Sequence, residues 1–138
     1  MGKINIEKIK PDIEKLAQKF HLSLVVLFGS QASGKTHAKS DFDLAVLTDH
    51  KFSREEYAKI ISDFSQALKI PSKRIDVTEL FHANPLLTRR IFFGGKLLCG
   101  DMSVFKRRKM IALKQAMDHK KFFVLKDDYI HQKLYGSS

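Results

Sequence analysis

The chain has 138 residues, of which 43% are apolar and 29% charged, a size and composition typical of one globular domain. Its apolar runs fall short of the ~20 residues that span a bilayer, its first residues lack the apolar core of a signal peptide, and its single cysteine excludes an internal disulfide. We therefore expect a cytoplasmic protein with no membrane partner, and the net charge of +10 favours an anionic partner: a nucleotide, a nucleic acid or an acidic protein surface.

The first predicted elements are one helix and two strands. Apolar residues recur at helical spacing from Ile9 to Phe20, and Pro11 predicts that this helix begins near Pro11 or bends there. Residues 22–28 and 42–48 form mostly apolar runs that are typical of buried strands, and a polar stretch separates them.

A second helix and a third strand follow along the chain. Ser53 and Glu56 have the spacing of a capping box, which predicts that a helix begins there, and its apolar spacing continues to Leu68. Residues 74–80 have the residue types of another strand, with an acidic residue between two apolar ones.

Two further helices are predicted in the last third of the chain. Asn84 as the N-cap and Pro85 at the first helical position begin a short helix, which Gly94 and Gly95 close. A strongly basic helix then begins near Ser103, and its methionines belong either to the core or to a partner surface.

The order of these elements predicts the fold class. Helices alternating with a few short strands indicate a small α/β (α+β) domain, with a mixed sheet backed by helices. We place this single domain at residues 1–125 and a C-terminal tail, which frays or is ordered by a partner, at residues 126–138.

The positive charge is concentrated in one segment. Between Arg89 and Lys121, ten Lys and Arg residues against two Asp residues give a charge of +8. This segment, which includes Arg90, either binds an anionic partner or forms a solvated helix face. Aromatic side chains are sparse in it, so nucleic acid is not expected as a direct substrate.

One loop matches a phosphate-binding motif, but the residues that follow it do not fit the fold that this motif requires. Residues 29–36 fit the Walker A pattern G-x-x-x-x-G-K-[ST] and follow a predicted strand. In a P-loop protein the loop opens a helix, and the chain then crosses over to a parallel strand, which takes a dozen residues or more. Here only four residues separate Thr36 from Asp41, so we reject the P-loop interpretation.

The same loop begins a second motif. Gly29 and Ser30 are followed, after ten residues, by Asp41 and Asp43. Residues two apart on a strand point to one face, so both carboxylates are directed to one place, and like charges held together favour a bound cation such as Mg²⁺. Asp76 on the third predicted strand supplies a further carboxylate, and three can hold two metal ions roughly 4 Å apart. The alternative is that these acids lie on a solvated face.

These residues resemble a known family. The run FGSQASGKTHAKSDFDLAVL, together with Asp76 of RIDVTEL, resembles the signature of the DNA-polymerase-β-type nucleotidyltransferase superfamily. Chain length and motif spacing are most similar to its minimal nucleotidyltransferases, the antitoxins of HEPN/MNT toxin–antitoxin pairs, and PLLTRRIFFGGKLLCGD resembles their region after the third carboxylate. Where that family often has Arg, this chain has Ser33, and Lys35 is the candidate for the missing positive charge.

The resemblance implies an activity and a set of site residues. It implies a Mg²⁺-dependent nucleotidyltransferase that moves AMP from ATP to a tyrosine hydroxyl of a cognate HEPN toxin and so acts as its antitoxin in a hetero-oligomer. The catalytic and metal-binding residues that it implies are Asp41, Asp43 and Asp76, and the nucleotide-binding residues are Gly29, Ser30 and Lys35.

Two other functions remain open from the sequence. A non-catalytic antitoxin or binding module would neutralise a toxin by forming a complex, and an antibiotic-type enzyme would transfer the nucleotide to a small molecule. The residues also leave open the base of the NTP, the number of nucleotides added and the stoichiometry of a complex.

Overall fold

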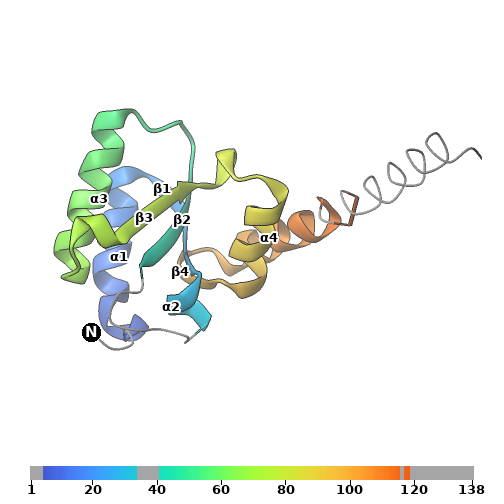
Figure 1. Cartoon of the computed structure of the whole chain (residues 1–138), viewed down its shortest axis with the longest axis horizontal. Coiled ribbons are helices and arrows are strands. Elements are labelled where there is room, and N and C mark those ends of the chain that lie inside the picture. Colours follow the sequence, from blue (N-terminus) through green and yellow to red (C-terminus); the bar gives the residue numbers. More distant parts are fainter. Residues whose placement is uncertain (1–4, 34–40, 116, 119–138) are drawn as a thin grey trace, which may run out of the picture.

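A computed structural model of the chain has four strands in one sheet, with helices on both faces of the sheet (Figure 1). The structure describes residues 5–33, 41–115 and 117–118, without the side chains of Ser30 and Ser33. None of the helices in these ranges is long and apolar enough to cross a membrane.

The sheet is mixed, and its strand order is β3-β2-β1-β4. Its strands are β1 (Leu22–Phe28), β2 (Phe42–Thr48), β3 (Ile75–Glu79) and β4 (Lys96–Gly100). β1 pairs antiparallel with both β2 and β4, whereas β2 and β3 are parallel. A P-loop requires a parallel strand after its crossover, so the antiparallel pairing of β1 with β2 confirms that the Walker A match is accidental.

Helices cover both faces of the sheet (Figure 1). α1 (Ile6–Phe20) and α3 (Arg54–Leu68) lie on one face, while α4 (Pro85–Gly94) and the helical residues 102–115 lie on the other. A single helical turn, α2 (Ser30–Ser33), follows β1. Two short 3₁₀ turns complete the described elements: η1 (Ser72–Arg74) and η2 (Leu80–His82).

Successive side chains of a strand point alternately into two apolar cores. Phe42, Leu44 and Val46 of β2 belong to the core beneath α1 and α3, whereas Ala45 and Leu47 belong to the core beneath α4 and residues 102–115. Both faces of the sheet are therefore buried, which is why β1 and β2 are mostly apolar rather than alternating with polar residues.

The predicted helix caps are confirmed. The Ser53 side chain accepts a hydrogen bond from the Glu56 amide at 3.1 Å, and the Glu56 carboxylate accepts one from the Ser53 amide at 3.4 Å. At α4, the Asn84 side chain accepts a hydrogen bond from the Leu87 amide at 2.8 Å, and Pro85 occupies the first helical position.

Pro11 marks neither the beginning of the first helix nor its first turn. α1 begins at Ile6, and Pro11 lies inside it. Proline lacks the amide hydrogen of one helical bond, but Ile6 and Ile9 pack against the core from the added turn. That packing offsets the missing bond and extends the helix past the proline.

β4 and α2 are not predicted by the sequence patterns. β4 has five residues, and Leu98 is the one fully buried side chain among them, so its alternation is too short to predict a strand. α2 has four residues and no apolar periodicity. The predicted tail at residues 126–138 lies outside the described residues, and the domain limit at residue 125 stays a prediction.

A substitution at Gly95, which joins α4 to β4, tests the packing of the sheet against α4. A Cβ atom at Gly95 would overlap the Ile91 carbonyl oxygen and lie 2.6 Å from Val26 Cγ1, whereas one at Gly94 meets nothing within 4 Å. We expect Gly95→Ala to lower the free energy of unfolding by roughly 1–3 kcal/mol, and the matched Gly94→Ala to change it by less than about 1 kcal/mol. Urea unfolding followed by circular dichroism measures both, and equal midpoints for the two variants would contradict this packing.

Candidate active site

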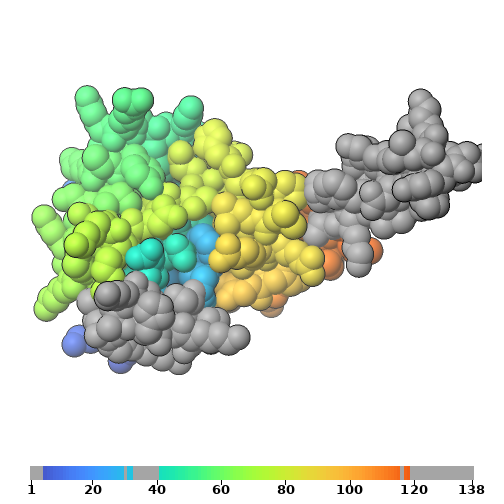
Figure 2. Space-filling model, in the orientation of Figure 1, coloured from blue at the N-terminus to red at the C-terminus, as the bar shows by residue number. Residues whose placement is uncertain are grey.

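Two acidic residues lie next to each other across the parallel strand pair. Asp43 of β2 is the Cα partner of Phe28 in β1 on one side and of Asp76 in β3 on the other. Asp43 and Asp76 each lie between two residues of the core beneath α1 and α3, so both side chains point to the opposite face, which α4 covers. Figure 2 shows this part of the sheet at the surface, where teal atoms of β2 lie next to blue atoms of β1 and yellow atoms lie beyond the blue ones.

The environment of Asp43 is unfavourable for a negative charge. Burial raises the pKa of Asp43, and the carboxylates of Asp76 and Asp41 raise it further. Arg90 of α4 acts in the other direction and lowers the pKa of Asp43. Asp43 is half-buried, whereas Asp41 and Asp76 are exposed beside it. Two carboxylates and one guanidinium therefore act on Asp43 in this corner.

Gly29 brings the backbone against the central carboxylate. It has a φ of 75°, in the left-handed region that favours glycine, directly after β1. A Cβ atom at this position would overlap Asp43 Oδ2 and lie 3.3 Å from Asp43 Cγ. Glycine is thus required both by the turn from β1 into α2 and by the closeness of the Asp43 side chain.

The structure places four of the six predicted site residues together. Asp41, Asp43, Asp76 and Gly29 share this corner of the sheet. Ser30 begins α2, but its side chain is not among those described, and Lys35 lies outside the described residues.

Arg90 is the residue that the sequence could not assign to the site. The basic segment contained Arg89 and Arg90 with no means of choosing between them. The charge of Arg90 acts on Asp43, and this relation depends on how α4 packs on the sheet.

The carboxylates have the chemistry of a magnesium site that a substrate completes. Within the described ranges no three His, Cys, Asp or Glu side chains form a group that could hold a metal ion by themselves. Mg²⁺ does not need one, because it keeps several waters and is bound by one or two carboxylates together with substrate phosphates. A bound cation would relieve the repulsion among Asp43, Asp76 and Asp41, so these residues fit the ion.

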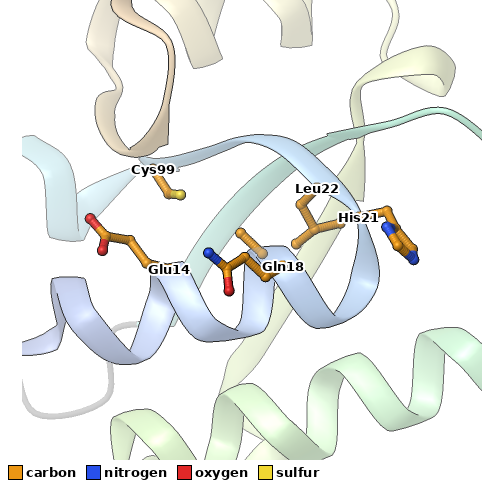
Figure 3. A pocket seen from close by; sticks show the side chains of 6 residues that line it. Glu14, Gln18, His21, Leu22 and Cys99 are labelled. Carbon is orange, nitrogen blue, oxygen red and sulfur yellow. The ribbon is translucent and has the colours of Figure 1, made fainter.

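A cavity lies away from the carboxylates, against α1. It has a volume of about 510 Å³ and lies between α1, the beginning of β1 and β4, with Glu14 and Gln18 along α1 and Cys99 facing them from β4 (Figure 3). Burial raises the pKa of the Cys99 thiol, and the charge of Glu14 adds to this. A thiol held in its neutral form is not an activated nucleophile, and Cys99 packs against the core beneath α1 and α3.

Residues 7–103 match the protein family described as "Polymerase beta, Nucleotidyltransferase". The chain belongs to this family. It is 35% identical over 89 residues to a protein named "Protein adenylyltransferase MntA" from Aphanizomenon flos-aquae (strain 2012/KM1/D3). That match covers 56% of this chain and 57% of the relative, so the chain spans little more than half the length of the relative.

Solved structures share the fold. A chain from a crystal structure described as a toxin–antitoxin with AMP-PNP has a TM-score of 0.69 at 23% identity, covering 87% of this chain and 98% of that one. A chain from a structure of a tri-AMPylated Shewanella oneidensis HEPN toxin in complex with an MNT antitoxin has a TM-score of 0.66 at 20% identity, covering 91% of this chain and 99% of that one. The predicted α/β (α+β) nucleotidyltransferase fold is confirmed.

The raised pKa of Asp43 predicts that the site destabilises the metal-free fold. A carboxyl group with a higher pKa in the folded than in the unfolded chain binds its proton more tightly in the fold, so stability falls as pH rises through these pKa values. We expect Asp43→Asn to unfold at a higher temperature than the wild type at neutral pH with a chelator present. The difference should vanish in acid below both pKa values, where the wild-type carboxyl group is neutral too. Calorimetry at both pH values measures this, and a lower midpoint for the variant at neutral pH would contradict it.

Proposed function

We propose that this protein transfers the AMP group of ATP to a tyrosine hydroxyl of a cognate HEPN toxin and thereby acts as the antitoxin of that toxin. The observation that carries the proposal is the in-register pair Asp43–Asp76 beside Gly29, in a member of a nucleotidyltransferase family. Burial and the charges of Asp76 and Asp41 raise the pKa of Asp43, and a carboxylate perturbed in this way is typical of a functional site.

The described relatives support ATP as the donor and a protein as the acceptor. The Aphanizomenon relative is named a protein adenylyltransferase, one solved complex of the same fold contains AMP-PNP, and another contains a tri-AMPylated HEPN toxin. These statements describe those proteins. For this chain they favour AMP over other nucleotides and a toxin over a small molecule.

The site residues have distinct tasks in such a transfer. Asp41, Asp43 and Asp76 would hold Mg²⁺, which when bound neutralises charge on the carboxylates and on the phosphates. Asp76 is exposed and can accept the proton of the incoming hydroxyl. The hydroxyl oxygen forms a bond to the α-phosphorus, the bond from this phosphorus to the bridging oxygen breaks, and pyrophosphate leaves.

Gly29 and Arg90 act on the phosphates. The absence of a side chain at Gly29 lets the backbone lie directly against the Asp43 carboxylate, so a triphosphate bound at that carboxylate would also be close to the Gly29 backbone. Arg90 places a positive charge on the α4 side of the same corner and offsets the negative charge that the nucleotide brings.

Transfer of label from α-³²P-ATP tests the proposal. The protein is incubated with Mg²⁺, labelled ATP and the purified HEPN-domain protein encoded beside it. We expect label on that protein, and Asp43→Asn should reduce the rate at least ~100-fold because positioning and charge stabilisation carry this chemistry. The matched control is Asp12→Asn, which makes the same change of charge at an exposed position of α1. This variant should label the HEPN-domain protein at the wild-type rate.

Two outcomes would reject the proposal. Tight complex formation without label from any of the four NTPs would leave a non-catalytic antitoxin. Label that persists in Asp43→Asn would mean that this carboxylate cluster does not carry the transfer.

A further inference from the structure

A groove of about 200 Å³ lies between η2, α4 and the helical residues 102–115. Buried Phe92 and Ala112 contribute to its lining. Phe81 and Ile111 also line it, yet they remain 58% and 45% exposed. Large apolar side chains that stay open to water around a groove are typical of a protein-binding site, because exposed apolar surface is otherwise unfavourable.

α4 connects this groove to the carboxylates. Thr88 and Phe92 of α4 line the groove, and Arg90, between them in sequence, acts electrostatically on Asp43. α4 has 10 residues, which corresponds to about 15 Å of helix. The groove and the residue that acts on Asp43 therefore share one short helix, and a protein that extends beyond the groove along this helix can present a hydroxyl group to the carboxylates.

The charges around the groove indicate the chemistry of its occupant. Arg108 is the charged residue of the groove lining, and the other basic residues of its helix turn, Lys106, Arg107 and Lys109, lie outside that lining. A second copy of this chain would bring the same basic residues, at a net charge of +10 per chain, against them. An acidic partner gains from the same arrangement, which also speeds its association.

We propose that this groove is the docking site for the acceptor protein, which inserts a large apolar side chain and pairs an acidic residue with Arg108. The inference rests on the proposed function in that the occupant is the protein that receives the nucleotide. Docking here fixes which hydroxyl group of the acceptor reaches Asp76. The groove thus determines specificity and takes no part in the chemistry.

Two matched pairs of variants test the groove. Ile111→Asp places a charge in it, and Met110→Asp places the same charge on the adjacent residue, which is 64% exposed and does not line the groove. Arg108→Glu reverses a charge in the groove, and Lys106→Glu reverses one on the same helix outside it. The full-length chain and the purified HEPN-domain protein are used in calorimetric titrations and in steady-state labelling with α-³²P-ATP.

We expect the groove variants to bind the HEPN-domain protein roughly 30-fold more weakly and to raise its KM by a similar factor, with kcat unchanged, since the loss of a central anchor dominates an interface. The two control variants should stay within ~3-fold of the wild type. Thermal melts of each pair verify that both members fold.

The outcomes separate the groove from the activity. Normal labelling together with equal affinities for groove and control variants would overturn the docking site and leave the proposed function intact. Weakened binding by the groove variants with no label in any sample would support the docking site and reject the transfer. A wild-type dimer in light scattering that Ile111→Asp dissociates would assign the groove to a second copy and overturn the proposal.

Discussion

The parallel register of β2 and β3 holds two carboxylates side by side, and the rest of the site depends on this unfavourable pairing. Asp43 lies opposite Asp76, is half-buried, and has a pKa raised by burial first and then by the neighbouring negative charges. Proteins keep such repulsion where it serves binding or catalysis, because the energy is recovered when a cation arrives. Gly29 lets the Asp43 side chain lie against the backbone, and Arg90 supplies positive charge.

The arrangement of the elements is what places Asp43 and Asp76 side by side. Parallel strands need a crossover, which α3 provides between β2 and β3, and a buried central strand needs a cover on each face. α4 covers the face on which the carboxylates lie, and it carries both Arg90 and part of the apolar groove lining. One helix therefore packs the second core, adjusts the electrostatics of the site and forms one wall of the groove.

Much of this could be predicted from local patterns. Asp43 and Asp76 stand between residues that alternate into the core, so strand periodicity alone predicts that they share a face. β4 could not be predicted, because five residues carry too little alternation, and α1 extends past Pro11 because tertiary packing outweighs a local preference. The role of Arg90 depends on the packing of α4, which no local pattern encodes.

The most direct test of the account is metal binding at the carboxylate pair, followed by electron paramagnetic resonance of Mn²⁺ in the presence of a non-hydrolysable ATP analogue. We expect the wild type to bind Mn²⁺ and Asp43→Asn not to bind it. We also expect the wild-type affinity to fall as the pH is lowered. Because the pKa of Asp43 is raised, protons compete with the metal at a higher pH than at an ordinary aspartate. Equal Mn²⁺ affinity in the wild type and in Asp43→Asn would contradict the assignment of this corner as the metal-dependent site.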